Sequence, residues 1–246
     1  MQQNYTERSQ PADTGPIYKE TNMSRLPVEP FNTVSNLIFL AVAIYWIKKT
    51  RFDMKKYPVT SFAMPILLLG YIGGTIFHAT RSHNLWLFMD YMAIMVLVLL
   101  ASVYMWKTLV NNWALTFILT LGPVFIYRIF SKFIVLSHQA SISLGYSVLA
   151  INVVLPAILH CIYRNPKGWK ALMSASAAFI VAIGCRQADS IEPLAKFLPM
   201  GTHFLWHIFG GISAFFLAEY LFKSEKIVYE NGFALKPRLQ QEIDRS

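Results

Sequence analysis

Seven apolar stretches dominate this chain of 246 residues. Each is close to the length of about 20 residues with which a helix crosses a lipid bilayer. Only 14% of the residues are charged, against about 25% in a typical soluble domain. The sequence therefore predicts an all-α membrane protein, a bundle of seven transmembrane helices. The predicted spans are 31–48, 60–80, 85–106, 112–130, 140–163, 168–185 and 200–222.

The loops between these spans are short, so we expect the seven helices to form one bundle and one domain over residues 31–222. A polar arm, residues 1–30, precedes this domain, and a polar tail, residues 223–246, follows it. The arm has no apolar core of the kind that a secretory signal contains, so we expect no cleavable signal peptide. The first span must then direct its own insertion.

Basic residues gather in alternate loops, and this asymmetry predicts an orientation. One set of loops holds Lys48, Lys49, Arg51, Lys55, Lys56, Lys107, Arg164, Lys167 and Lys170. The opposite set holds Arg81, Lys132, Arg186 and Lys196. Cytoplasmic loops carry the excess of Lys and Arg, which places the N-terminus outside and the tail in the cytoplasm. The net charge of +9 is explained by these loops, and no clustered basic and aromatic face indicates binding of nucleic acid.

Four ionisable side chains fall in one layer of this topology, near the outer face. His203 and His207 are four residues apart and share one helix face in the last span. His78 lies near the outer end of the second span, and Asp90 lies near the outer end of the third. Imidazoles and carboxylates in hydrocarbon are costly and usually mark a functional site. The other interpretation is that they make hydrogen bonds between helices.

This set of side chains has the composition of a catalytic zinc site. Three neutral imidazoles that leave one coordination position open are a known zinc ligand set. Zinc lowers the pKa of bound water to about 7 and polarises a carbonyl group. A carboxylate such as Asp90 next to the metal can orient or deprotonate that water. We therefore predict zinc at His78, His203 and His207.

Four short motifs resemble those of the alkaline ceramidases, a family in the CREST superfamily of seven-helix membrane hydrolases. The motifs are Glu29-Pro30-Phe31-Asn32-Thr33-Val34-Ser35-Asn36, Phe77-His78-Ala79-Thr80, Asp90-Tyr91 and His203-x3-His207. The resemblance implies a zinc-dependent amidase that hydrolyses ceramide to a sphingoid base and a fatty acid. It assigns zinc to His78, His203 and His207, and it makes Asp90 the catalytic carboxylate.

The resemblance also implies a calcium site in the N-terminal arm. Animal members of the family bind calcium there, and their pattern is similar to Glu20-Thr21-Asn22 followed by Glu29. Oxygen ligands are those that calcium prefers. This chain has Ile17 where the family has an aspartate. The alternative is an arm in which Glu20, Asn22 and Glu29 cap the bundle by hydrogen bonds alone.

One departure from the family pattern concerns a serine. The family has this serine four residues before the first histidine, and this chain has Gly74 there. Thr75 is three residues before His78 and remains on roughly the same helix face. We therefore expect the Thr75 hydroxyl to steady the substrate carbonyl or the attacking water, with Ser82 as a weaker substitute.

The leading hypothesis is a ceramidase whose lipid substrate reaches the site sideways between helices. It places the site near the non-cytoplasmic face of a bacterial inner membrane, endoplasmic reticulum or Golgi. Two alternatives stay open: a related hydrolase acting on a phospholipid ester or another lipid amide, and a receptor-like protein with structural zinc. Haem binding is disfavoured because His203 and His207 share a helix face. The sequence leaves the oligomeric state open.

Overall fold

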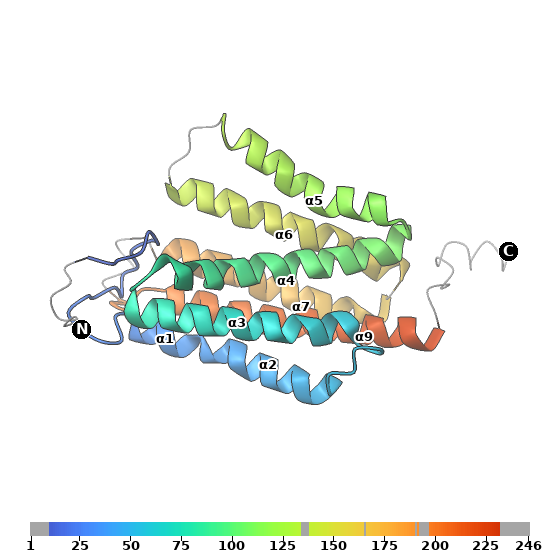
Figure 1. The fold of residues 1–246 in the computed structure, drawn as a ribbon, viewed down its shortest axis with the longest axis horizontal. Helices are drawn as coiled ribbons and strands as arrows, with labels where there is room; N and C mark the ends of the chain where they lie inside the picture. The colour runs from blue at the N-terminus through green and yellow to red at the C-terminus, as the bar shows by residue number, and fades with distance from the viewer. Residues whose placement is uncertain (1–9, 134–137, 165, 190, 192–196, 232–246) are drawn as a thin grey trace.

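Long helices lying side by side make up the structure (Figure 1). The computed structural model describes residues 10–133, 138–164, 166–189, 191 and 197–231, and these residues contain no strand. Residues 1–9 of the predicted arm and 232–246 of the predicted tail lie outside this description. The helices are α1 (Pro30–Ser35), α2 (Leu37–Thr50), α3 (Pro58–Thr80), α4 (Asn84–Val110), α5 (Trp113–Phe130), α6 (His138–Tyr163), the 3-10 turn η2 (Pro166–Gly168), α7 (Trp169–Ala188) and α9 (His203–Asn231).

Within the described residues, seven helical segments are long and apolar enough to cross a membrane, in agreement with the predicted all-α, multi-pass membrane protein. The segments begin and end within a few residues of the predicted spans, with one larger difference. The last helix, α9, continues to Asn231, beyond the predicted end of the span at 222. Its final turns pair Lys226 with Glu230 four residues later, and such pairs support a helix beyond its apolar part.

The first span is interrupted at Asn36, which separates α1 from α2. Pro30 occupies the first turn of α1, where proline is well tolerated. The Ser35 hydroxyl and the Asn36 amide both donate to the Asn32 carbonyl. Such side-chain bonds compete with the helical backbone ladder. The interruption therefore follows from the polar residues of the Asn32-Thr33-Val34-Ser35-Asn36 motif.

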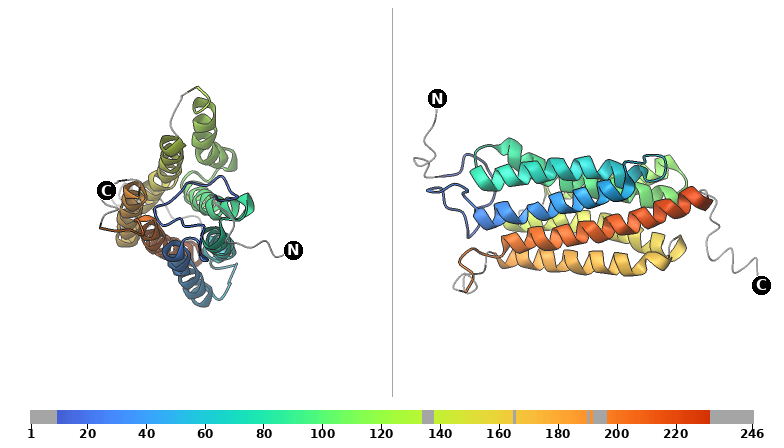
Figure 2. Two further views of the ribbon diagram at one scale, coloured as in Figure 1. Left: turned by 90° about the vertical axis from the view of Figure 1, so that its left-hand side faces the viewer. Right: turned by 90° about the horizontal axis from the view of Figure 1, so that it is seen from below.

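The bundle has two distinct ends. The N-terminal arm and the α3–α4, α5–α6 and α7–α9 connections lie at one end, called here the arm end (Figure 1). The α2–α3, α4–α5 and α6–α7 connections lie at the other end, called the basic end because most of the Lys and Arg residues named above lie in these connections or in the adjoining helix turns. Helix α5 packs against α4 and α6 at the edge of the bundle, as the end-on view of Figure 2 shows.

The apolar core consists of two clusters. One surrounds Trp46 and Met64, and the other surrounds Met105 and Tyr220. Helices α3 and α4 lie against each other so closely that a Cβ atom added to Gly73 would overlap Met89. Small residues permit such close approach, on which helix association in lipid depends.

Polar contacts at the basic end tie α9 to its neighbours. The buried carboxylate of Glu225 accepts hydrogen bonds from the backbone N–H groups of Val59 and Thr60 and from the Thr60 hydroxyl. It thereby caps the N-terminus of α3, where donors have no partner within the helix. His160, also buried, lies 2.7 Å from the Tyr220 hydroxyl through its Nδ1 atom.

We predict that Glu225→Ala lowers the melting temperature of the purified protein by several degrees. The change leaves three donors at the start of α3 without their acceptor, and each unsatisfied buried group costs about 1–3 kcal/mol. Thermal unfolding followed by tryptophan fluorescence in detergent measures the effect. Glu230→Ala is the matched control, because Glu230 is half-exposed and its ion pair with Lys226 is long, at 3.9 Å. Such a pair contributes little to stability. Equal melting temperatures for the two variants would contradict the role assigned to Glu225.

Candidate metal centre

Three histidines come together at the arm end of the bundle. One ligand atom from each of His78, His203 and His207 lies within 4.8 Å of the others, and all three residues are buried. Ligand nitrogens on tetrahedral zinc are about 3.4 Å apart, because each Zn–N bond is about 2.1 Å long. Small rotations of the rings would close the set around an ion. Within the described ranges, no other group of three His, Cys, Asp or Glu side chains has this spacing.

His203 is positioned by a cap on the first turn of α9. The carboxylate of Asp189, which follows α7, accepts hydrogen bonds from the backbone N–H groups of Thr202 at 2.7 Å and His203 at 3.1 Å. A carboxylate at a helix N-terminus satisfies free donors and favours the helix dipole. The Thr202 hydroxyl also donates to the Cys185 carbonyl at 2.6 Å. These bonds fix where α9 begins and therefore where both of its histidines lie.

Glu29 orients His78. The Nδ1 atom of His78 lies 2.5 Å from a carboxylate oxygen of Glu29. Its other nitrogen, Nε2, is buried and has no hydrogen-bond partner among the described residues. A carboxylate bonded to the far nitrogen of a metal-binding histidine is the usual support for that ligand. Burial favours the neutral acid, but the hydrogen bond and charge of His78, together with Arg81, lower the pKa of Glu29 to about 2.

The other two histidines also have one nitrogen left for an ion. Nδ1 of His207 lies 3.2 Å from the Asn32 carbonyl and 2.7 Å from the Ser35 hydroxyl. A carbonyl only accepts, so the proton belongs on Nδ1, which leaves Nε2 available. The ring of His203 stacks on Tyr18 at 3.8 Å between centroids, and its Nδ1 has no hydrogen-bond partner in the described part of the chain.

The N-terminal arm covers the three histidines, and buried ion pairs attach the arm to the end of α3. Arg81 donates to Asp13 at 2.9 and 2.7 Å and to Glu29 at 2.7 Å, and all three side chains are fully buried. A buried charge is tolerated when it is paired and hydrogen-bonded in this way. The backbone of the arm also bonds to the end of α3, from Val28 to Ala79 and from Glu29 to His78.

Asp90 lies against α3 one turn before His78. A Cβ atom added to Gly74 would be 2.5 Å from the Asp90 Oδ1 atom and 3.2 Å from the Asn36 Oδ1 atom. The carboxylate therefore occupies the space that a serine at position 74 would need. The Thr75 hydroxyl is buried and has no hydrogen-bond partner among the described residues, whereas Ser82 lies 2.7 Å from the Thr80 hydroxyl.

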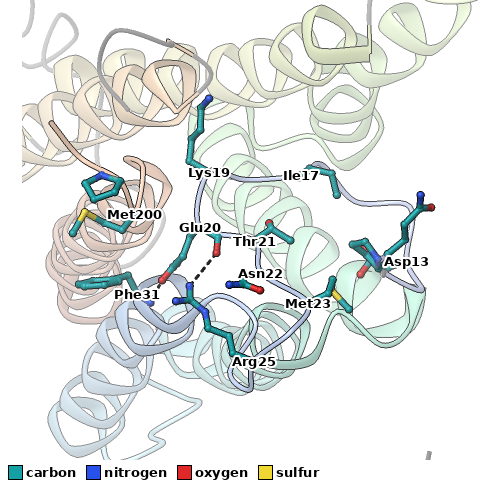
Figure 3. A pocket seen from close by; sticks show the side chains of 13 residues that line it. Asp13, Ile17, Lys19, Glu20, Thr21, Asn22, Met23, Arg25, Phe31 and Met200 are labelled. Carbon is teal, nitrogen blue, oxygen red and sulfur yellow. Dashed lines mark hydrogen bonds between the residues drawn. The ribbon is translucent and has the colours of Figure 1, made fainter. Parts of the chain in front are cut away.

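The three residues that the family resemblance assigns to calcium make hydrogen bonds within the protein. Glu20 accepts from the backbone N–H group of Phe31 (Figure 3), and it also accepts from the backbone N–H group of Asn32. Asn22 accepts from Ser24, and Glu29 has the partners described above. Burial raises the pKa of Glu20. The bonds of Glu20 cap the start of α1, as the alternative to calcium requires; a calcium ion in the arm stays a prediction.

Several residues of the centre were not singled out by the sequence. Ser35 and Asn32 belong to the motif at the start of the first span, but nothing in that motif indicates a contact with His207. The sequence indicates Arg81 only as one of the basic loop residues that predict the orientation. Asp13 and Asp189 lie in polar stretches without a pattern. Their roles depend on contacts between residues that are far apart in the chain.

Comparison with known protein families and with curated protein sequences found no significant match for this chain.

We predict that Glu29→Gln weakens zinc binding by about 10–100-fold, the usual effect of removing such a supporting partner. Glutamine keeps an oxygen for Arg81 but lacks the charge that holds the His78 proton on Nδ1. Zinc affinity is measured by competition with a chromophoric chelator at equilibrium. Glu20→Gln is the control, since Glu20 is another buried arm glutamate and its carboxylate accepts hydrogen bonds from the start of α1 and not from the histidines. Equal zinc affinity in wild type and Glu29→Gln would contradict this role.

Proposed function

We propose that the protein is a zinc-dependent lipid amidase acting within the membrane, with ceramide as its substrate class. The observation that carries this proposal is the convergence of three buried histidines, two of which have a buried nitrogen without a partner among the described residues. Unsatisfied buried polar atoms are rare and require an explanation. A metal ion bound by these nitrogens provides it.

The residues of the centre have separate roles in this proposal. His78, His203 and His207 would hold the zinc. Bound zinc supplies a Lewis acid for the amide carbonyl and makes a neighbouring water acidic enough to attack at neutral pH. Asp90, beside the α3 turn that precedes His78, accepts the proton of the attacking water and returns it to the nitrogen of the leaving amine. The Thr75 hydroxyl donates to the oxygen on which negative charge develops.

An apolar cavity below the histidines supports a lipid substrate. It has a volume of about 150 Å³ and is lined by α2, α3, α4, α6, α7 and α9, including Phe39, Leu97, Val153, Trp206, Gly210 and Leu217. Trp206 adjoins His207, and Leu217 lies ten residues further along α9 (217 − 207 = 10). A helix rises 1.5 Å per residue, so the cavity extends about 15 Å from the centre. We propose that an acyl chain occupies it, with its carbonyl at the histidines.

The proposal includes an orientation and a route for the substrate. The basic residues at the basic end match the charge excess of cytoplasmic loops, and this excess supports an orientation with the arm and the histidines at the non-cytoplasmic face. The arm covers the centre along the bundle axis, since Tyr18 stacks on His203 and Arg81 ties Asp13 to Glu29. A lipid then reaches the centre sideways, between helices.

We predict that His203→Ala loses both bound zinc and ceramide hydrolysis, whereas Asp90→Asn keeps the zinc and loses hydrolysis by about 100-fold or more. Metal content is measured by mass spectrometry of the purified protein, and fatty acid release by lipid mass spectrometry. Equal turnover by wild type and His203→Ala would overturn the mechanism. Full zinc without turnover of any lipid in a panel of amides and esters would favour a receptor-like protein with structural zinc.

We predict that Ala214→Phe abolishes lipid hydrolysis while zinc content is unchanged. Ala214 lines the apolar cavity, and a phenyl ring there would fill the space of the acyl chain. Ala177→Phe is the control, because Ala177 is exposed on α7 and does not line the cavity. Hydrolysis and zinc are measured as above, and normal turnover of ceramide by Ala214→Phe would exclude this cavity as the acyl site.

A further inference from the structure

Arg186 lies at the arm end of the apolar cavity. It is in the last turn of α7, and its guanidinium lies over the rings of Tyr146, at 4.9 Å from the centroid, and Trp206, at 5.9 Å. Both rings line the cavity. A positive charge is therefore placed over two rings of the cavity wall, and one of them belongs to the sequence neighbour of His207.

This guanidinium retains donors for a ligand. Stacking on aromatic rings uses the face of the planar group, and the five N–H bonds point outward along its edge. Among the residues that the structure describes, which exclude 190 and 192–196, no carboxylate pairs with Arg186. Asp189 is the nearest acidic residue in the described sequence, and its oxygens accept from the backbone of Thr202, His203 and Lys19.

Arg186 is also close to the reacting centre. Its charge acts on the His203 ring and on the Tyr18 phenol that stacks on that ring. Trp206, beneath the guanidinium, is the neighbour of His207 in α9. A lipid amide with its acyl chain in the cavity and its carbonyl at the histidines extends its amine portion away from the cavity. That portion emerges in the layer where Arg186 lies.

We propose that Arg186 binds an anionic group, a carboxylate or a phosphate, on the amine portion of the substrate. An unmodified ceramide offers only hydroxyl groups there, whereas a phosphorylated ceramide or an N-acyl amino acid offers an anion that a guanidinium binds through two parallel hydrogen bonds. The inference rests on the proposed function, in which the amide of the bound lipid is hydrolysed at the histidines. Water adds OH to the acyl carbon and H to the nitrogen as the C–N bond breaks, so no other reactant is needed.

The test compares binding of three lipids that share one acyl chain: ceramide, ceramide phosphate and an N-acyl amino acid. Binding to zinc-loaded protein in detergent is measured by native mass spectrometry, which requires no turnover. We expect both anionic lipids to bind wild type at least ten times more tightly than ceramide. Arg186→Gln should remove this preference, and Arg186→Lys, which keeps the charge without the planar fork, should retain part of it.

Arg128→Gln is the matched control, because Arg128 is also in the last turn of a helix at the arm end, on the peripheral α5. It should keep the full preference. Equal binding of neutral and anionic lipids by wild type, or an unchanged preference in folded Arg186→Gln, would overturn the inference. Anion binding that depends on Arg186 in a protein that hydrolyses none of the three lipids would refute the proposed function alone. A preference for one anion over the other would identify the headgroup.

Discussion

One buried carboxylate, that of Glu29, joins the parts of the arm end to one another. It accepts hydrogen bonds from the Thr21 hydroxyl in the arm, the Asn32 amide in α1, the His78 ring and the Arg81 guanidinium at the end of α3. A carboxylate is stable without water only when its oxygens are fully bonded. Glu29 therefore requires all four partners in place, and their positions in turn set those of the arm, the first span and the His78 ring.

The seven helices could be predicted because lipid leaves the backbone few choices. Without water, each peptide group must bond within its own helix, so an apolar stretch of sufficient length predicts a span directly. The layer of histidines could also be predicted, because counting turns from the end of each span gives its depth. The extension of α9 to Asn231 was missed, since the charged residues of its last turns had no apolar pattern.

What the sequence does not contain is the choice of partner for each polar group. Glu29 is predicted only as a possible calcium ligand, and its contacts with His78 and Arg81 become visible only in the structure. The sequence motif presents Gly74 only as the lack of a hydroxyl, whereas in the structure a Cβ atom at this position would lie 2.5 Å from the Asp90 Oδ1 atom. Gly74 therefore leaves room for the Asp90 carboxylate. This packing depends on side chains from two helices and cannot be recognised in either segment alone.

The unbroken course of α9 has a consequence for how this chain can vary. One helix of 29 residues carries His203 and His207 in its first turns and Glu225, the cap of α3, near its other end. Each residue turns a helix by about 100°. Inserting or deleting one residue between His207 and Glu225 would rotate the two sets of contacts apart, so that one set could form only at the expense of the other. The number of residues in this interval is therefore as tightly constrained as the identities at its ends.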